Sequence, residues 1–362
     1  MTNDNSNMTT PRAPVSLVRA SIQAMSGYTP GEQLAGGKYI KLNTNENPYP
    51  PSPKVDREIR AAMERGLQRY PDPAASSFRE RAAQVLGVAP EGILCGNGSD
   101  DILTIVTRAF VSEGQFVRFP RPSYLLYRTL AEIQGGRCEE VLFQPDWSLG
   151  DDFVAAADGL RLAYLANPNS PSGTVISPQR VLQIAEQLPC PLLVDEAYVD
   201  FAEQNCLDLV AENEKIMVSR SLSKSYALAG LRFGYLVAHP SLIEQLEKIK
   251  DSYNCDSLAI AGAVAAIDDQ AWLVENRAQI LATRARTTCR LRELGFSVVP
   301  SQANFVWCTH PDQPARKIYD RLRDNRILVR YMDYPGWGDG LRISVGTDEQ
   351  MDACFGVLES IL

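Results

Sequence analysis

Short apolar runs alternate with helical stretches between about residues 90 and 240, and this alternation constrains the fold more than any other feature of the chain. Each run has the length of a strand, and the stretches between the runs are long enough to cross back over a sheet as helices. Such a pattern is typical of an α/β domain with a mostly parallel sheet and helices on both faces. We therefore expect seven strands, at residues 92–95, 116–119, 138–143, 160–166, 192–194, 216–219 and 234–238.

The pattern changes in the last third of the chain. Residues 241–294 are nearly all helical in pattern and include a long helical stretch at 272–294. Shorter apolar runs and further helical stretches follow, so we expect a smaller α+β domain at this end of the sequence. Its strands are expected at residues 296–299, 303–308, 327–330 and 341–345.

The net charge limits the partners that this chain can have. Its 362 residues carry a formal net charge of −8, with a sequence pI near 5.1. A field of this sign repels nucleic acid and anionic membrane surfaces, so we expect small-molecule chemistry and neither kind of partner. No apolar run has the length of a membrane span, and the polar first residues lack the apolar core of a secretion signal. We therefore expect a cytoplasmic protein.

The cysteines and histidines exclude most metal centres. The eight cysteines are scattered and none lies in a C-x-x-C pair, which is typical of free, mostly buried thiols in a reducing compartment. The only histidines are His239 and His310. A multi-histidine metal site is thereby excluded, and we expect no metal.

A glycine-rich turn follows the first expected strand. It has the sequence GNGSD at residues 96–100 and leads into a helical run. Glycines let backbone amides approach an anion, and the N-terminus of a helix adds unpaired N–H groups and a positive dipole end. The turn therefore predicts a phosphate site at Ser99 and Asp100. Two alternatives stay open: these two residues could only cap the helix, and a dinucleotide site is a weaker candidate because the third glycine of G-x-G-x-x-G is missing.

The expected strand at residues 192–194 runs into a carboxylate, Asp195, with Tyr198 three residues further on. A carboxylate at the end of a buried strand is costly unless a cation pairs with it. A protonated pyridine nitrogen would be such a cation. The preceding strand ends in ANPNSPSG, residues 166–173, a turn rich in hydrogen-bonding side chains. The alternative is that Asp195 only caps a helix or forms a turn.

Lys224 is surrounded by hydroxyl groups. Ser221 and Ser223 precede it, and Arg232 follows after a small, apolar run that we expect to be buried. A desolvated lysine loses proton affinity and becomes an amine nucleophile for a carbonyl group. We therefore expect a lysine held for covalent chemistry on a phosphate-bearing cofactor, and an ordinary surface lysine is the alternative.

The spacing of Ser221 and Lys224 also matches the S-x-x-K motif of serine β-lactamases and penicillin-binding proteins. The chain contains no S-D-N or K-T-G element and no secretion signal. That class of enzyme is excluded.

In their order along the chain, these motifs resemble those of the fold type I aminotransferases, which use pyridoxal 5'-phosphate (PLP). The resemblance implies the PLP-dependent transferase fold type I, and it covers almost the whole chain. Within this group, LNTNENPYPPSP at 42–53 and SLSKSYALAGLRFGY at 221–235 look most like the histidinol-phosphate aminotransferases of histidine biosynthesis. The other matching motifs are RYP at 69–71, GSD at 98–100, RPSY at 121–124, DEAY at 195–198 and LRI at 341–343.

The resemblance implies catalytic roles for three residues. Lys224 would bond to the aldehyde carbon of the cofactor and then move the proton at the substrate's α-carbon. Asp195 would keep the pyridine nitrogen protonated, which makes the ring an electron sink. Tyr198 would donate a hydrogen bond to the ring oxygen O3'. The remaining cofactor contacts would come from the stacked ring of Tyr124, the amides of Ser99 and Asp100, the hydroxyls of Ser221 and Ser223, and Arg232.

One position departs from the family pattern. Alignment on N-P-[ST]-G places Ser170 where an asparagine normally contacts O3', and Asn169 lies one residue earlier. Either Ser170 gives a weaker hydrogen bond or Asn169 takes over the contact. We do not expect the change to abolish activity, because Tyr198 and Asp195 remain.

The resemblance also implies how substrates are bound. Arg330 and Arg342 match the anion-binding arginines of the family, and arginine forks suit both phosphate and carboxylate groups. Without the resemblance, a surface salt bridge is an equally good interpretation of Arg330. Tyr70 matches a tyrosine that reaches across from a second subunit, and Tyr28 would close the site from the N-terminal segment. A shared site implies a homodimer.

We therefore expect transamination between histidinol phosphate and 2-oxoglutarate. An aromatic amino acid aminotransferase and a threonine-phosphate decarboxylase are alternatives of the same fold. A non-catalytic PLP-binding sensor is a weaker alternative, because no basic helix-turn-helix segment precedes the expected domain. The expected organisation is a disordered tail at 1–15, a segment at 16–47 packed on the small domain and the dimer partner, a large PLP-binding domain at 48–270 and a small domain at 271–362.

Overall fold

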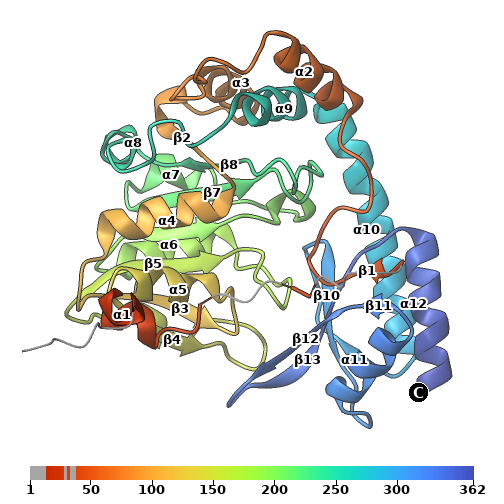
Figure 1. Cartoon of the computed structure of the whole chain (residues 1–362). Coiled ribbons are helices and arrows are strands. Elements are labelled where there is room, and N and C mark those ends of the chain that lie inside the picture. The colour runs from red at the N-terminus through yellow and green to blue at the C-terminus, as the bar shows by residue number, and fades with distance from the viewer. Residues whose placement is uncertain (1–13, 28–30, 33–37) are drawn as a thin grey trace, which may run out of the picture.

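The computed structural model describes residues 14–27, 31–32 and 38–362 (Figure 1). Most of the predicted disordered tail lies outside these residues. Pro14 and Val15, which the prediction included in that tail, lie in the short 3₁₀ helix Pro14–Leu17. The end of the tail at residue 15 stays a prediction.

A seven-stranded sheet forms the centre of the larger part of the molecule, with the strand order β2-β8-β7-β6-β5-β3-β4. The strand β8 is antiparallel to both of its neighbours, whereas β7, β6, β5, β3 and β4 run parallel to one another. The seven strands predicted from the apolar runs are therefore confirmed, with shifts at their ends. Their bounds are Ile93–Gly96 (β2), Phe116–Arg121 (β3), Arg137–Leu142 (β4), Leu160–Ala166 (β5), Leu192–Asp195 (β6), Ile216–Ser221 (β7) and Gly234–Val237 (β8).

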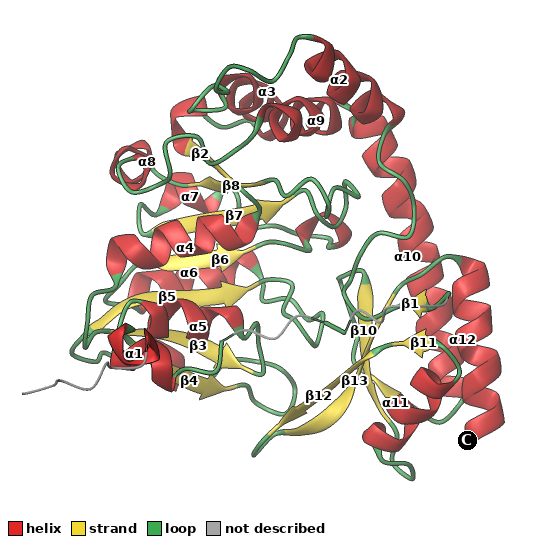
Figure 2. Cartoon of the chain, viewed as in Figure 1, coloured by secondary structure: helices red, strands yellow, loops and turns green. Residues whose placement is uncertain are grey.

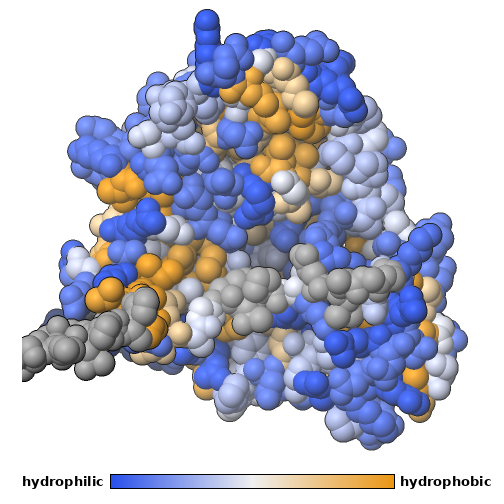
Figure 3. Space-filling model, viewed as in Figure 1, coloured by the Kyte–Doolittle hydropathy of each residue, from blue (hydrophilic) through white to orange (hydrophobic). Residues whose placement is uncertain are grey.

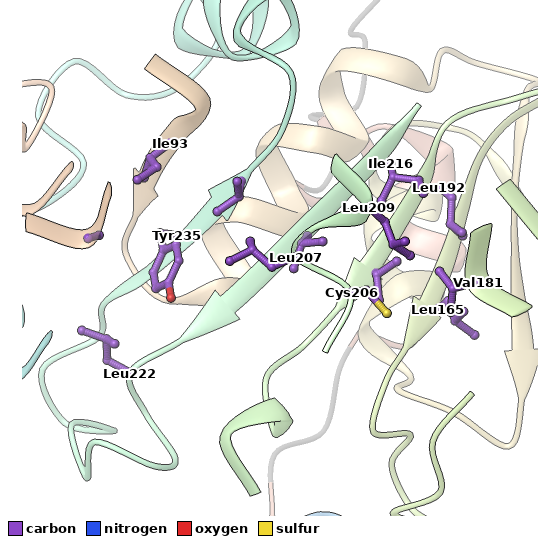
Figure 4. Packing of buried hydrophobic residues seen from close by; sticks show 14 of the residues in the cluster. Ile93, Leu165, Val181, Leu192, Cys206, Leu207, Leu209, Ile216, Leu222 and Tyr235 are labelled. Carbon is purple, nitrogen blue, oxygen red and sulfur yellow. The ribbon is translucent and has the colours of Figure 1, made fainter. Parts of the chain in front are cut away.

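Both faces of this sheet are buried, and alternate residues of a strand point to opposite faces. In β6, Leu192 and Val194 belong to one apolar cluster and Leu193 belongs to another. Figure 4 shows part of the first cluster, in which Leu192 lies near Val181 of a covering helix. Burial on both faces explains why the inner strand β6 begins with a continuous apolar run, residues 192–194, rather than an alternating pattern.

Helices cover both faces and one edge of the sheet. The helices α4, α5 and α8 contribute to the second cluster, whereas α3, α6 and α9 contribute to the first. The helix α2 packs on α9 at the top of the molecule in Figure 1. The bounds are Pro53–Glu64 (α2), Ser76–Leu86 (α3), Ser99–Phe110 (α4), Leu126–Ile133 (α5), Pro178–Gln187 (α6), Leu209–Glu212 (α7), Pro240–Glu247 (α8) and Ser257–Asp268 (α9).

The long helical region predicted at 241–294 is interrupted. Residues 248–256 between α8 and α9 are not helical, and Asp256 caps α9 by accepting hydrogen bonds from the amides of Leu258 and Ala259. Such a cap fixes the start of a new helix. The long helix α10, Gln270–Glu293, follows and descends toward the smaller part of the molecule (Figure 1).

The smaller part contains an antiparallel sheet with the order β12-β13-β10-β9. The strand predicted at 327–330 is wrong as a single element, because Val329 separates two short strands. The strand β11 (Ile327–Leu328) pairs with β1 (Ile40–Lys41), whereas β12 pairs with β13. The other bounds are Ser297–Val298 (β9), Phe305–Thr309 (β10), Arg330–Tyr334 (β12), Gly338–Ser344 (β13), Ala315–Asp324 (α11) and Asp348–Ile361 (α12).

The N-terminal segment contacts both parts of the molecule. The helix α1 (Ala20–Ala24) packs on α5, and Arg19 donates a hydrogen bond to the carbonyl of Ile133. Glu32 forms an ion pair with Arg323 of α11. The prediction that this segment packs on the small domain is therefore incomplete, since its first helix lies against the large sheet's helices.

A membrane-spanning helix was not expected. Among the described residues, no single helix has both the length and the apolar composition needed to cross a bilayer. The helices α9 and α10 meet these two conditions when taken together, but they are bent by 77° where they join.

Candidate active site

The residues predicted to form the site lie along one edge of the large sheet. The strands β5, β6 and β7 are parallel, so their carboxyl ends meet at the same edge. In Figure 2 the arrowheads of these strands point toward the smaller part of the molecule. Pairing through β8 places the carboxyl end of β2 at this edge as well.

The glycine-rich turn brings the N-terminus of α4 to this edge. Gly98 is the N-cap residue and provides no side chain to satisfy the first amides of the helix. Ser99 and Asp100 are already helical, so the alternative that they only cap the helix is wrong. The free amides and the dipole of α4 therefore remain available to an anion.

Two glycines permit a close approach between this turn and its neighbours. A Cβ atom at Gly98 would lie 2.5 Å from Nη2 of Arg232, and Gly98 has a φ of +81°. A Cβ atom at Gly234 would lie 2.6 Å from the amide nitrogen of Ser99. Only glycine fits at either position without displacing these groups.

Arg232 makes only long polar contacts with the residues that the structure describes. Its guanidinium lies 3.3 Å from a carboxylate oxygen of Asp100, 3.5 Å from the hydroxyl of Ser223 and 3.4 Å from the carbonyl of Ala229. Ser221 is the last residue of β7, so its hydroxyl belongs to the same edge. Arg232, Ser221, Ser223 and the start of α4 together offer the donors that a phosphate group requires.

Asp195 is a buried carboxylate without a cationic partner. Its oxygens accept hydrogen bonds from the hydroxyls of Tyr127 (2.9 Å) and Ser219 (3.2 Å) and from the amide of Ala197 (3.3 Å). No lysine or arginine among the residues that the structure describes forms an ion pair with it. Burial raises the pKa of Asp195 to about 6, although these hydrogen bonds oppose the rise. A protonated pyridine nitrogen is the kind of group that this carboxylate lacks.

Lys224 lies in the loop after β7 and is only partly buried. Its Nζ atom donates to the carbonyl of Thr44 at 3.2 Å and lies 5.8 Å from the centre of the Tyr198 ring. The apolar run that follows Lys224 is partly exposed, with Gly230 at the surface, so the prediction of a buried run is wrong. The run forms turns over the sheet edge rather than a core element.

Asn47 holds the backbone beside Lys224. Its side-chain amide donates to the carbonyls of Lys224 (2.9 Å) and Ser225 (3.2 Å) and lies 3.1 Å from the side-chain oxygen of Asn276 in α10. Asn47 belongs to the family motif at residues 42–53, but no separate role was predicted for it. The contact joins residues 177 positions apart, and no local pattern predicts it.

Tyr198 and Tyr124 contact different neighbours in the candidate site. The hydroxyl of Tyr198 accepts a hydrogen bond from the side chain of Asn45 at 2.9 Å. The hydroxyl of Tyr124 donates to Asp100 at 3.2 Å, and its ring meets that of Tyr127 edge-on at 5.6 Å. Asn45 and Tyr127 are further contacts that the sequence did not reveal.

The geometry distinguishes Asn169 from Ser170. Asn169 uses its whole amide within the turn: it donates to the carbonyl of Pro122 and to Ser172, and it accepts from Ser123. Ser170 accepts from a guanidinium nitrogen of Arg342 at 2.8 Å, which leaves its own hydroxyl proton free to donate. Of the two alternatives for the O3' contact, this arrangement favours Ser170.

Arg330 and Arg342 are direct partners across the antiparallel pair β12 and β13. Arg342 donates to Ser170 and to the carbonyl of Asn43, and its buried Nε atom has no hydrogen-bond partner. It forms no ion pair with any carboxylate in the described part of the chain. Residues directly opposite each other on an antiparallel pair carry their side chains on the same face of the sheet, so the two arginines are suited to bind an anion at that face.

Of the two predicted tyrosines that remain, Tyr70 lies apart from these residues and Tyr28 lies outside the part of the chain that the structure describes. Tyr70 is 79% exposed and stacks on Tyr253, with ring centroids 4.4 Å apart. Among the described residues, Tyr70 forms no hydrogen bond, ion pair or ring contact with the cluster around Lys224. Tyr28 lies outside the residues that the structure describes.

The described residues include no group of three or more histidine, cysteine, aspartate or glutamate side chains placed to hold a metal ion. The donors at the sheet edge instead fit the predicted cofactor. The start of α4 and Arg232 suit its phosphate, and the unpaired carboxylate of Asp195 suits its ring nitrogen.

Comparison with known proteins identifies the family. Residues 37–358 match the family model described as aminotransferase class I and II. The chain is 56% identical over 342 residues to a histidinol-phosphate aminotransferase of Rhodopirellula baltica, covering 94% of each chain. It is 46% identical to one from Geotalea uraniireducens, covering 95% of this chain and 99% of the relative.

A solved structure agrees with these sequence matches. The histidinol-phosphate aminotransferase of Sinorhizobium meliloti, determined in complex with pyridoxal-5'-phosphate, superposes with a TM-score of 0.87 at 28% identity. The match covers 96% of this chain and 99% of that chain. The chain has the fold of the PLP-dependent type I aminotransferases, and it belongs to the class I and II aminotransferases and, within them, to the histidinol-phosphate aminotransferase family.

Proposed function

We propose that this protein transfers an amino group between L-histidinol phosphate and 2-oxoglutarate, with PLP as its cofactor. The pair Arg330 and Arg342 carries the proposal for the substrate. One substrate offers a phosphate and the other offers carboxylates, so one site must bind two kinds of anion in turn. Two arginines at directly paired positions of one strand pair suit both, because a guanidinium group binds phosphate and carboxylate alike.

The sheet edge offers suitable groups for both the phosphate and the ring nitrogen of the cofactor. The phosphate would be held by the amides of Ser99 and Asp100, the hydroxyls of Ser221 and Ser223, and Arg232. When bound, the cofactor supplies an aldehyde that takes up the amino group and a cationic ring that withdraws electrons. Asp195 would hold the ring nitrogen in its protonated form, because an ion pair relieves the cost of burying the carboxylate.

The protein's own groups would handle the proton at the substrate's α-carbon. Lys224 Nζ would remove this proton and return it at the carbon of the cofactor that carried the aldehyde, acting as general base and then as general acid. Tyr198 and Ser170 would orient the ring through its phenolic oxygen. Tyr124 would cover one face of the ring and exclude water from it.

We also propose that two copies of the chain form a homodimer in which Tyr70 completes the partner's site. Tyr70, Leu67 and Leu258 line an open hollow of about 520 Å³. The helix α9 is apolar around most of its circumference, and Figure 3 shows an apolar area over this helix at the surface. A helix that is apolar all round is normally buried, so a second chain is a suitable cover.

The cysteines support the proposed cytoplasmic location. All eight are free thiols, and six of them are buried. Free buried thiols are typical of proteins in a reducing compartment.

The domain division at residues 48–270 and 271–362 remains a proposal. The large sheet and its helices lie within the first range, and the small antiparallel sheet lies within the second. The helix α10 spans the boundary, since it begins at Gln270.

Steady-state assays of the purified protein with PLP test the proposed reaction. Glutamate is the amino donor, imidazole acetol phosphate and phenylpyruvate are compared as acceptors, and carbon dioxide release from threonine phosphate is measured separately. We expect the imidazole phosphate to be the preferred acceptor. Strong turnover of phenylpyruvate with none of the imidazole phosphate would refute the proposal, and so would carbon dioxide release as the main reaction.

Replacing arginine with lysine tests the anion pair. Arg330→Lys and Arg342→Lys keep the charge but lose the fork, and we expect KM for the imidazole phosphate to rise roughly 10- to 100-fold in each. The exposed Arg321→Lys is the matched control and should leave KM unchanged. Unchanged KM in both site variants would contradict the assignment.

A further inference from the structure

The motif NTNEN at residues 43–47 lies between the two parts of the molecule. At one end, the carbonyl of Asn43 accepts a hydrogen bond from Arg342 of the small antiparallel sheet. At the other end, Asn47 holds the backbone of Lys224. The segment 43–47 therefore contacts both the anion-binding strand and the reactive lysine.

Asn45 occupies the middle of this segment in an unusual backbone conformation. Its φ is +54°, a left-handed value that asparagine tolerates better than other residues with a side chain. The residue is 1% exposed, and its backbone carbonyl accepts from Asn304 while its amide donates to the hydroxyl of Ser344 at 2.9 Å. These contacts fix the position from which its side chain starts.

The contacts of Asn45 determine the orientation of its side-chain amide. The hydroxyl of Ser344 accepts from the backbone amide of Asn45 and donates its own proton to Oδ1 of Asn45, at 2.9 Å in both cases. Oδ1 therefore faces Ser344, and Nδ2 faces Tyr198. Nδ2 donates to the Tyr198 hydroxyl at 2.9 Å.

This direction of donation has a consequence for Tyr198. A phenolic hydroxyl has one proton to donate and can also accept. Because its oxygen already accepts from Asn45, the Tyr198 hydroxyl keeps its proton for another acceptor. An acceptor in place of Nδ2 would instead take this proton.

We propose that Asn45 is a positioning residue that directs the hydroxyl proton of Tyr198 toward the cofactor's phenolic oxygen and ties it to the strand that carries Arg342. Ser344 lies two residues after Arg342 on β13, so both side chains point to the same face. The relay Ser344–Asn45–Tyr198 therefore begins beside the anion site. The inference rests on the proposed function in one respect, that Tyr198 faces bound PLP.

Four variants test this relay. Asn45→Asp has the same shape but offers an oxygen to Tyr198, which reverses the hydrogen bond. Asn45→Gly keeps the left-handed backbone and removes the donor, and Ser344→Ala removes the group that orients the amide. The control is Asn325→Asp, the same exchange at an exposed residue that bonds only to the end of its own helix.

The readout is the pKa of the visible absorbance change of the PLP-loaded protein, which reports protonation of the lysine–cofactor linkage. A donor to the cofactor's phenolic oxygen lowers this pKa. We expect a rise of about one unit in Asn45→Asp, smaller rises in Asn45→Gly and Ser344→Ala, and no change in Asn325→Asp. We also expect kcat to fall roughly tenfold in Asn45→Asp, with a smaller effect on KM.

A double-mutant cycle separates the relay from a simple charge effect. The new carboxylate of Asn45→Asp could raise the pKa through space, and that contribution would be equal in the presence or absence of the Tyr198 hydroxyl. We expect the rise in a Tyr198→Phe background to be less than half of that in the wild type. Equal rises in the two backgrounds, or no rise in Asn45→Asp, would overturn the proposal.

The titration distinguishes this inference from the proposed reaction. It requires only PLP and Lys224, so it gives a result even if imidazole acetol phosphate is not the substrate. If Asn45→Asp does not fold, as judged by its thermal unfolding, Asn45→Gly and Ser344→Ala still test the relay. A normal pKa in both would then refute it.

Discussion

Replacement of Asp195 with asparagine should stabilise the cofactor-free protein while weakening cofactor binding. Asp195 is 5% exposed, and burial raises its pKa from 3.8 to about 6. A rise of about two units corresponds to about 3 kcal/mol of unfavourable ionisation in the folded state. Asparagine cannot ionise, so it avoids this cost. It has an NH₂ group in place of one of the two carboxylate oxygens, however, and each hydrogen bond lost there offsets the gain in stability by about 1 kcal/mol. We expect a net gain of about 1–2 kcal/mol above pH 7.

The pH dependence gives the sharper test of this reasoning. Folded Asp195 holds its proton more tightly than unfolded Asp195, so the ionisation penalty is absent below about pH 4 and complete above about pH 6. The stability of the variant minus that of the wild type should therefore increase between these values and stay constant at higher pH. Urea unfolding of both cofactor-free proteins, at equal protomer concentration, measures this difference.

Asp269 provides a control, because its pKa is lowered rather than raised and its replacement should change the stability in the opposite direction. The side-chain hydrogen bond from Ser52, with support from Lys54, lowers the pKa of Asp269. Asp269→Asn should therefore lose stability relative to the wild type at neutral pH and recover it in acid. PLP should raise the unfolding midpoint of the wild type more than that of Asp195→Asn. A stability difference for Asp195→Asn that is the same at pH 5 and pH 8 would refute the claim of an unpaired buried carboxylate.

Three further changes have defined expected outcomes. Glu196→Ala removes the carboxylate that lies 2.8 Å from the buried guanidinium of Arg220, and it should lower the free energy of unfolding in urea by about 3–5 kcal/mol. Glu293→Ala, which breaks an exposed ion pair with Arg290, should lower it by less than about 1 kcal/mol. Ser170→Ala removes an acceptor from Arg342 and should raise KM for glutamate roughly tenfold in steady-state assays, with unchanged unfolding midpoints. The Tyr70→Phe protein should be weakly active and the Lys224→Ala protein inactive. After their subunits are mixed and exchanged, about half of the dimers are mixed and each of these has one intact site, so about a quarter of the wild-type activity per protomer should return. No recovery despite exchange would contradict a shared site.

The large sheet was predictable from the sequence because its strands are buried on both faces. A continuous apolar run such as residues 192–194 then marks a strand without any need for long-range information. The smaller sheet was harder to predict. The run at 327–330 carries one apolar pattern but changes partner at Val329, from β1 to β13, and the choice of partner depends on residues far away in the chain.

The candidate site, too, has a part that was predictable from the sequence and a part that was not. Lys224, Asp195 and the turn at 96–100 lie at strand ends, where a pattern in the sequence indicates their position. Asn45 and Tyr127 act through hydrogen bonds to residues 153 and 68 positions away. Local periodicity and spacing do not predict such long-range contacts. The family motif therefore indicates that Asn45 belongs to the site, but it does not predict which residues Asn45 contacts.

The paired arginines of β12 and β13 have a practical consequence for measurements on this enzyme. Inorganic phosphate and sulfate offer the anionic oxygens that the guanidinium groups of Arg330 and Arg342 would bind in the substrate. These ions should compete with both substrates and protect the small antiparallel sheet against unfolding. Apparent KM values will then increase with the concentration of phosphate in the buffer, and substrate preferences are best compared in a buffer without oxyanions.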